Sequence, residues 1–349
     1  MERRGIVLHE KAQPNSSSSL NMSTVPSIIA GGATWGHNVN DDEAQRQMAS
    51  LKAIGVREID TAALYPFSKP TMSEQIIGNS RFGQDGFLID TKIMWFNGGK
   101  GTLTKDNIPK SVDESLERLG LEKVNVLYAI GPDHETPLEE QAAAFDGVYR
   151  QGKFATLGLS NFSPEMLEKY VEIAQKNGYV KPSVYQGQYN LICRTYEATL
   201  LPFLRKHDIA FAAFSPLAQG MLTSKLTFAE NQDEDLKGTR FDTAKDNMYG
   251  LNARRWYDKP SFHDAIRKMK SACEPYGLDT TDAAMRWIVN HSILDGTRGD
   301  GIIIGPRNKE QCDKYIQGIQ GGPLPEELVK TLNGLWEGVS DDAASILEY

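Results

Sequence analysis

Short apolar runs alternate with longer amphipathic stretches along the chain from Ser27 onward. The runs are continuously apolar, which is typical of strands whose two faces are both buried in a parallel sheet. They predict strands at Ile28–Gly31, Glu58–Asp60, Phe87–Lys92, Val124–Ile130, Thr156–Leu159, Ser183–Gln186, Ile209–Phe214 and Gly301–Ile304.

The stretches between and after these runs carry apolar residues at helical spacing. Ser163 followed by Pro164 is typical of a helix start, and Gly120 after Leu119 is typical of a helix end. The spacing predicts helices at Asp42–Ile54, Ser73–Ile77, Ile108–Leu119, Leu138–Tyr149, Pro164–Gln175, Tyr196–Lys206 and Lys309–Ile316.

Strand–helix units repeated along a chain of 349 residues predict an α/β fold, the (β/α)8 TIM barrel. The alternative is an open doubly wound sheet, which usually carries GxGxxG after its first strand, whereas residues 31–36 lack that spacing. We expect one domain over residues 26–349, preceded by a flexible polar tail at 1–25. A long insertion before the last strand and a C-terminal helical extension should lie near the mouth or base of the barrel.

Composition narrows the function classes. Lys and Arg total 38 against 46 Asp and Glu, a net charge of −8 without a basic run, so no nucleic-acid surface is expected. The three cysteines lie far apart and form no metal-ligand pattern. Without a long apolar stretch or a signal segment, we expect a cytoplasmic protein that binds no metal and no membrane and is a monomer or homodimer.

Polar side chains stand at the ends of several predicted strands, where barrel active sites are built. Asp60 and Lys92 end two of these strands, and Tyr65 follows shortly after Asp60. A free tyrosine has a pKa near ~10, and a neighbouring ammonium group would lower it. Because an aspartate would hold that ammonium in place, Asp60, Tyr65 and Lys92 are predicted to form an acid catalyst.

Ordered motifs run over most of the chain. They are Asp60-Thr61-Ala62-x-x-Tyr65, Ser73-Glu74-x-x-Ile77-Gly78, Thr91-Lys92, Gly158-Leu159-Ser160-Asn161-Phe162, Tyr185-Gln186-x-x-Tyr189-Asn190 and Phe214-Ser215-Pro216-Leu217-Ala218-x-Gly220-x-Leu222-Thr223-x-Lys225. In this order they resemble the aldo-keto reductases, in particular the branch that includes aflatoxin aldehyde reductases. The resemblance implies a TIM barrel that binds NADPH without a Rossmann domain. It also implies hydride transfer to a carbonyl, with Tyr65 as proton donor.

The resemblance further implies a cofactor site. In this site Ser160, Asn161 and Gln186 would hold the nicotinamide carboxamide. The segment 215–225 would hold the pyrophosphate, and Arg307 with its neighbours would hold the adenosine 2′-phosphate. The tyrosines of the segment 185–190 would surround the nicotinamide ring. The predicted cofactor residues are Ser160, Asn161, Gln186, Ser215, Pro216, Leu217, Gly220, Leu222, Lys225, Arg240, Gly305, Arg307, Asn308 and Gln311. A guanidinium suits a phosphate dianion, so NADPH is favoured over NADH.

Two positions depart from the family pattern. When the fourth strand is aligned on Pro132-Asp133, Ile130 occupies the place of the usual catalytic histidine, so one hydrogen-bond donor for a substrate carbonyl is missing. Tyr315 stands where the family usually has an asparagine, near the adenine end. The predicted substrate pocket comprises Trp35, Trp95, Ile130 and Tyr249.

Three functions remain open on these residues. The first is an NADPH-dependent reductase that acts on the carbonyl or conjugated enone of a bulky small molecule. The second is a non-redox acid/base enzyme on the same barrel, an isomerase, dehydratase or cyclase. The third, which the retention of Asp60, Tyr65 and Lys92 argues against, is a cofactor-binding protein without turnover.

Overall fold

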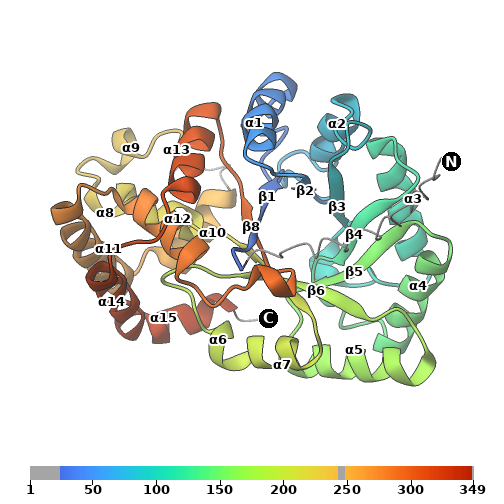
Figure 1. Cartoon of the computed structure of the whole chain (residues 1–349). Helices are drawn as coiled ribbons and strands as arrows, with labels where there is room; N and C mark the ends of the chain where they lie inside the picture. Colours follow the sequence, from blue (N-terminus) through green and yellow to red (C-terminus); the bar gives the residue numbers. More distant parts are fainter. Residues whose placement is uncertain (1–23, 243–247, 348–349) are drawn as a thin grey trace, which may run out of the picture.

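Eight parallel strands close into a barrel in the order in which they occur along the chain (Figure 1). The computed structural model describes residues 24–242 and 248–347, so the predicted tail lies almost entirely outside the described residues. Because β1 pairs with both β2 and β8, the sheet has no free edge, and the doubly wound alternative is wrong. The strands are β1 (Ser27–Gly31), β2 (Glu58–Asp60), β3 (Leu88–Lys92), β4 (Val124–Ala129), β5 (Phe154–Ser160), β6 (Pro182–Gln188), β7 (Ala210–Phe214) and β8 (Gly301–Ile304).

Helices cover the outside of the barrel. Ser163 caps its helix by accepting a hydrogen bond from the Met166 amide at 3.2 Å, and Gly120 ends another with φ 64°, as predicted. The helix predicted over 196–206 is divided at Leu200, because Pro202 in the first turn of the second piece lacks the amide that would continue the first. These helices are α1 (Asp41–Ala53), α2 (Met72–Asn79), α3 (Asn107–Leu119), α4 (Leu138–Arg150), α5 (Pro164–Asn177), α6 (Tyr196–Thr199), α7 (Leu201–Lys206) and α13 (Lys309–Gln320).

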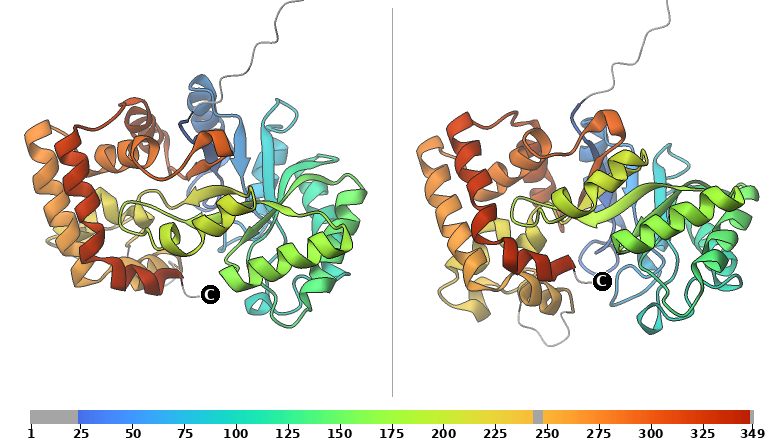
Figure 2. Two further views of the ribbon diagram at one scale, coloured as in Figure 1. Left: turned by 60° about the horizontal axis from the view of Figure 1, so that its bottom comes forward. Right: turned by 90° about the horizontal axis from the view of Figure 1, so that it is seen from below.

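The insertion before β8 and the C-terminal extension form a group of helices at one side of the barrel (Figure 2). The buried Tyr257 anchors the insertion, since its hydroxyl accepts hydrogen bonds from Gln188 Nε2 at 2.5 Å and Asn190 Nδ2 at 3.1 Å. The group comprises η2 (Ala218–Thr223), α8 (Lys225–Phe228), α9 (Gln232–Asp235), α10 (Met248–Tyr257), α11 (Pro260–Cys273), η3 (Glu274–Tyr276), α12 (Thr280–Asn290), η4 (Gly296–Arg298), α14 (Glu326–Gly334), η5 (Trp336–Gly338), α15 (Ser340–Ala344) and η6 (Ser345–Leu347).

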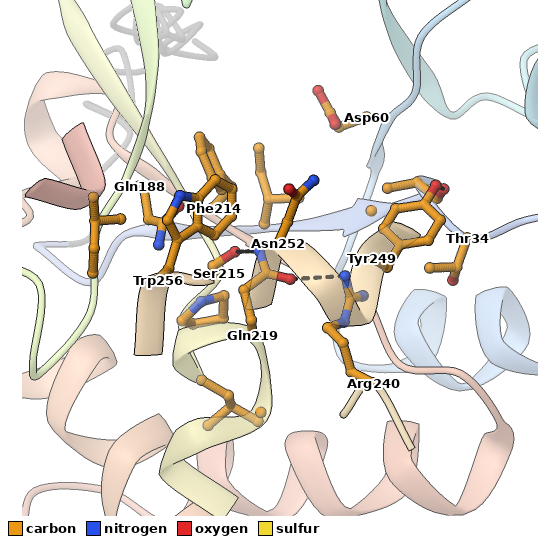
Figure 3. A pocket seen from close by; sticks show the side chains of 18 of the residues that line it. Thr34, Asp60, Gln188, Phe214, Ser215, Gln219, Arg240, Tyr249, Asn252 and Trp256 are labelled. Atoms are coloured by element: carbon orange, nitrogen blue, oxygen red, sulfur yellow. Dashed lines mark hydrogen bonds between the residues drawn. The ribbon is translucent and has the colours of Figure 1, made fainter. Parts of the chain in front are cut away.

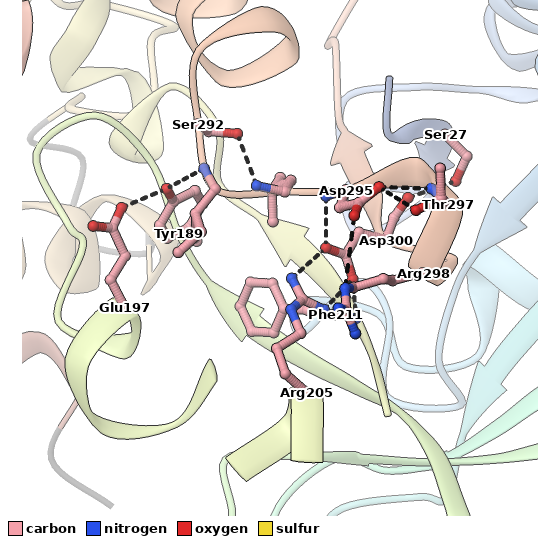
Figure 4. Close-up of polar contacts among 12 residues, drawn as sticks. Ser27, Tyr189, Glu197, Arg205, Phe211, Ser292, Asp295, Thr297, Arg298 and Asp300 are labelled. Atoms are coloured by element: carbon pink, nitrogen blue, oxygen red, sulfur yellow. Dashed lines mark hydrogen bonds and ion pairs between the residues drawn. The ribbon is translucent and has the colours of Figure 1, made fainter. Parts of the chain in front are cut away.

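A buried carboxylate holds the barrel together at the N-terminal ends of β7 and β8 (Figure 4). Asp300 is fully buried and accepts two hydrogen bonds from Arg205, at 2.8 and 2.5 Å. It also accepts from the backbone amides of Phe211 and Asp295, each at 2.8 Å. Because both oxygens of this carboxylate accept hydrogen bonds, the cost of burying it is compensated. This end of the barrel is therefore structural.

Candidate active site

A cavity of about 560 Å³ opens at the C-terminal ends of the strands. Its walls come from the strand ends and from η2 and α10 of the insertion (Figure 3). The helix η6 near the C-terminus also contributes to the lining. Most of the predicted site residues line it: Asp60, Tyr65, Lys92, Ile130, Ser160, Asn161, Gln186, Ser215, Pro216, Leu217, Gly220, Lys225, Arg240, Tyr249, Gly305, Arg307 and Gln311.

A buried ion pair lies at the ends of β2 and β3. Lys92 Nζ donates to Asp60 Oδ1 at 2.6 Å and to the Thr61 carbonyl at 2.8 Å, and the lysine is 1% exposed. Gln186 Nε2 donates to the same Asp60 oxygen at 2.7 Å. A buried charge is tolerated when it is paired and hydrogen-bonded, and these contacts hold the ammonium group at a fixed position in the site.

Tyr65 lies beside this pair. Lys92 Nζ is 5.0 Å from the centroid of its ring. Burial raises the pKa of the Tyr65 phenol well above its ordinary value, and the negative charge of Asp60 raises it further. The direction expected from the sequence is the opposite one, because that expectation weighs the lysine without the desolvation of the phenol. Tyr65 is therefore a neutral phenol that carries its proton at ordinary pH.

Ile130 follows β4 directly and borders the cavity with an aliphatic side chain. Asn161, at φ 59°, donates from Nδ2 to the Ile130 carbonyl at 2.7 Å. This bond ties the end of β4 to the end of β5, so the position of Ile130 is fixed by its neighbour. The amide oxygen of Asn161 is left to accept a hydrogen bond from a ligand.

Two tryptophans predicted for the substrate pocket do not line the cavity. Trp35 is 1% exposed and packs against Phe82 in the core, with ring centroids 5.9 Å apart. Trp95 lies against the backbone of the adjacent loops, where a Cβ on Gly99 or Gly131 would come within 2.4 or 2.8 Å of its ring. Both rings therefore contribute to packing, since large aromatic side chains bury much apolar surface.

Leu222 and Asn308 also lie outside the cavity lining. Leu222 is fully buried in the core, and Asn308 caps α13 by accepting a hydrogen bond from the Gln311 amide at 2.9 Å. Tyr185 and Tyr189, predicted near the nicotinamide ring, are fully buried and donate to the Phe162 carbonyl and to Glu197, at 2.8 and 2.7 Å. These residues build the frame of the site.

One end of the cavity is strongly cationic. Lys225, Arg240 and Arg307 line it, whereas Asp60, which is bound to Lys92, is the one acid among the described lining residues. Arg240 Nη1 donates to Gln219 Oε1 at 2.7 Å, and Arg307 donates to the Gly238 carbonyl. Burial lowers the pKa of Arg240, and the nearby charge of Arg307 lowers it further. Two guanidinium groups this close together favour an anionic ligand.

The loop after β7 has an unusual backbone. Ser215, Ala218 and Gln219 have φ values of 57°, 51° and 57°, and Gly220 and Ser224 follow at 104° and 66°. Such conformations cost energy for residues other than glycine and cluster at ligand sites. The amides of Ala218 and Gly220 donate within the loop to the carbonyls of Ser215 and Leu217, which holds this backbone in place.

The insertion contributes a bridge across the mouth of the barrel. The Tyr249 hydroxyl donates to the Ala33 carbonyl at 2.8 Å and accepts from the Phe67 amide at 3.1 Å. The Arg240 guanidinium lies 5.3 Å from the centroid of the Tyr249 ring. Burial raises the pKa of Tyr249 to about 12, so this bridge keeps its proton at ordinary pH. It links the cationic end of the cavity to the loops around Tyr65.

Several lining residues were missed by the sequence analysis. Phe214 could have been found, because it ends the predicted seventh strand as Gln186 ends the sixth. The others come from loops and helices whose position depends on the whole fold. They include Phe67, Gln219, Asn252, Arg255, Trp256, Ser345, Ile346 and Leu347.

Two other classes of site are absent from residues 24–242 and 248–347. This part of the chain contains no group of three or more His, Cys, Asp or Glu side chains arranged to hold a metal ion. It also contains no helix with the length and apolar character needed to cross a bilayer.

Comparison with known proteins agrees with this architecture. The profile of the Aldo/keto reductase family matches residues 27–337. An aldo-keto reductase of Pseudocercospora fijiensis is 33% identical over 84% of this chain and 98% of its own length. Aflatoxin B1 aldehyde reductase member 2 of Mus musculus is 32% identical over 91% and 86%, and oxidoreductase sirO of Leptosphaeria maculans is 33% identical over 91% and 96%. The barrel, its polar strand ends and these matches show that the chain belongs to the aldo/keto reductase family of oxidoreductases.

Proposed function

We propose that the protein is an NADPH-dependent reductase that acts on a carbonyl or conjugated enone of a bulky small molecule. One observation carries this proposal. A neutral phenol beside a buried ion pair shares a single cavity with a cationic end, and the described residues that line this end include no acid. The same cavity therefore offers both a proton donor and a site for a phosphorylated cofactor.

The residues present fit a phosphorylated dinucleotide. Arg307 and Arg240 would hold the 2′-phosphate, and Lys225 with the strained loop after β7 would hold the pyrophosphate. The amide oxygen of Asn161 suits a carboxamide, and the ring of Phe214 offers an aromatic face at the same level of the barrel. When bound, the reduced nicotinamide supplies the hydride.

Side chains of the protein itself would supply the proton and stabilise the charge that is left. Tyr65 donates its phenol proton to the oxygen of a carbonyl substrate or, in a conjugated enone, to a carbon of the double bond. Tyr65 then becomes a phenolate. The ammonium of Lys92 lies close enough to stabilise that phenolate in a water-poor site, where a fixed charge is most effective. Asp60 and the Thr61 carbonyl keep the ammonium group in place during the reaction.

Ile130 defines the substrate side. An isoleucine cannot donate a hydrogen bond, so Tyr65 alone would polarise the reacting oxygen. Phe67, Phe214 and Trp256 add aromatic surface to the same cavity. The balance of one donor and much apolar surface suits a large, apolar substrate. The Mus musculus relative is called an aldehyde reductase, which is in keeping with carbonyl reduction.

The cofactor assignment is tested by calorimetry with NADPH and NADH. NADPH should bind clearly more tightly, and Arg307→Ala should remove much of the difference, because a charge-assisted contact to phosphate contributes roughly 1.5–3 kcal/mol. Lys309→Ala, which removes an exposed cation two residues away, is the matched control and should leave the preference intact. Equal affinities of the parent protein for the two cofactors would overturn the assignment.

A non-redox reaction would use the same phenol as an acid without a hydride. Single-turnover mixing with NADPH and candidate carbonyl compounds separates the two functions. Loss of the reduced-nicotinamide absorbance in step with product formation supports the reductase. Product formed at unchanged absorbance supports the isomerase, dehydratase or cyclase alternative. NADPH binding without any product would support a cofactor-binding protein.

A further inference from the structure

Tyr315 places an aromatic ring in the cationic end of the cavity. It belongs to α13 and follows Gln311 by four residues, as Gln311 follows Arg307. Residues four apart lie one above the other on a helix face, so Gln311 and Tyr315 share one face of α13. Arg307 precedes the helix, and all three residues line the same cavity. The ring is half-buried and packs partly against the core, which holds its plane in position.

Two arginines lie near the phenol. Burial raises the pKa of Tyr315, and the charges of Arg240 and Arg307 oppose that rise. The surroundings of the ring therefore combine an aromatic face with two guanidinium groups, and none of the described residues that line this end is an acid. Aromatic rings and guanidinium planes are the two protein surfaces on which a nucleobase stacks.

We infer that Tyr315 is the surface on which the purine of the bound dinucleotide stacks, and that it makes the site tolerant of the identity of that purine. This inference rests on the proposed function, because it assumes that the cationic end takes an adenosine phosphate. In such a ligand the base is attached next to the 2′-oxygen, so a phosphate held by Arg307 brings the base to the neighbouring helix face. Stacking recognises the face of the base and leaves its hydrogen-bonding edge unread.

The first test measures the binding of adenosine 2′,5′-bisphosphate by calorimetry, with no catalytic turnover involved. Tyr315→Leu keeps the apolar contact with the core but removes the aromatic face, and its affinity should fall about tenfold. Tyr315→Phe keeps the face and should bind as the parent does. Tyr276→Leu removes an exposed tyrosine outside the cavity lining and should bind unchanged.

The second test uses the parent protein alone. Nicotinamide hypoxanthine dinucleotide phosphate changes the edge of the base but keeps a stacking face. Its affinity should lie within about threefold of that of NADP, because stacking is tolerant of base identity. A loss of about tenfold or more would mean that the edge is read by hydrogen bonds, and it would overturn the inference.

The outcomes separate the two proposals. Failure of the parent to bind either NADPH or the bisphosphate would overturn the proposed function and this inference together. Tight binding by the parent and equally tight binding by Tyr315→Leu would overturn the stacking role alone. Loss of affinity in both Tyr315→Leu and Tyr315→Phe would show that the hydroxyl, not the ring face, makes the contact, and would also overturn it.

Discussion

At the scale of single residues, the chemistry depends on the proton of one phenol. Burial and Asp60 raise the pKa of Tyr65, so the proton is present at ordinary pH. Tyr65→Phe keeps the ring and removes the proton. Turnover of the true substrate should fall by about 10²-fold or more, while NADPH binding measured by fluorescence titration stays near that of the parent. Near-full activity of the variant would assign the proton to another residue.

Ile130 is the second residue whose role can be measured. Ile130→His restores a donor at the end of β4 and should raise the reduction of simple aldehydes, by at most ~2.7–4 kcal/mol of barrier for a well-placed donor and less for an unoptimised one. The same ring should hinder the native substrate, because an unpaired buried imidazole costs about 1–3 kcal/mol.

The quantity to compare is the ratio of aldehyde to native-substrate kcat/KM in the parent and in Ile130→His. Ile130→Val is the control, since it keeps an aliphatic surface and should leave the ratio unchanged. A ratio that stays flat or falls in the histidine variant would show that position 130 lies outside the reacting space. The alignment of the fourth strand on Pro132-Asp133 would then be wrong.

Residue types at strand ends were the part of the site that sequence could predict. Asp60 and Lys92 end two of the predicted strands, and a barrel brings all strand ends to one face. The environment of a side chain, in contrast, could not be predicted from the sequence. Phe214 lines the cavity whereas Trp35 and Trp95 do not, and residue type alone does not show this difference. The pKa of Tyr65 depends on its burial in the folded protein.

At the scale of elements, one family motif is structural. Ser73, at the start of α2, donates to the Gly32 carbonyl at 2.9 Å and contacts the Thr61 hydroxyl at 2.7 Å. Glu74 is fully buried and accepts from Thr91 at 2.6 Å and from Arg118 at 2.7 Å. The motif Ser73-Glu74-x-x-Ile77-Gly78 thus joins α2 to β3, to the residues that directly follow β1 and β2, and to α3.

Gly78 lets α2 approach α3 closely. A Cβ at this position would lie 2.1 Å from the Arg118 carbonyl oxygen, a backbone atom. Gly78→Ala should therefore destabilise the protein by about 1–3 kcal/mol or more through overpacking. Gly147→Ala is the matched control on α4, where a Cβ would meet nothing within 4 Å. It should stabilise by about 0.5–1 kcal/mol, because glycine weakens helix interiors.

Urea unfolding of the two glycine variants measures both effects. The sign of the change should differ between them although the substitution is the same. If Gly78→Ala were as stable as the parent, α2 and α3 could separate freely, and the motif would need another explanation.

The position of the insertion shows what sequence patterns could not predict. The sequence predicts an insertion before the last strand, but the place of its helices at the mouth depends on contacts between distant residues. Gln188 and Tyr257 are 69 positions apart, and Lys259 and Ser345, joined at 2.7 Å, are 86 apart. The wall formed by α10 and η6 follows from these contacts, so its lining residues apart from Tyr249 could not be named in advance.

At the scale of the whole molecule, the interior of the barrel is divided into two halves. Ile29, Ala212 and Ile303 form a small apolar cluster on the side of β1, β7 and β8. Buried carboxyl groups lie on the other side, with Asp60 and Asp90 opposite each other on β2 and β3. Lys92 compensates Asp60, whereas no cation among the described residues forms an ion pair with Asp90, and global stability should therefore depend on its protonation.

Asp90 is 1% exposed, and its Oδ1 accepts from Asn125 Nδ2 at 2.8 Å and from the Val126 amide at 3.1 Å. Burial raises the pKa of this carboxyl well above its usual range, and the charge of Glu58 raises it further. An aspartate in the unfolded chain releases its proton at about pH 4. From there up to the raised folded pKa the native state alone holds the proton, so the free energy of unfolding should fall as pH rises through this window.

Asp90→Asn tests this directly, because an amide keeps the acceptor for Asn125 and Val126 but cannot ionise. The parent should lose stability as the pH rises above about 4, where an unfolded aspartate ionises, and the variant should show a flatter dependence and equal or greater stability at the upper end of the pH range. Asp264→Asn changes a carboxyl whose side chain is 66% exposed and should follow the parent curve. Chemical unfolding across that range gives all three curves. If the free energy of unfolding of Asp90→Asn fell as steeply with pH as that of the parent, Asp90 would be ionised in the folded barrel. The pH dependence would then come from another group.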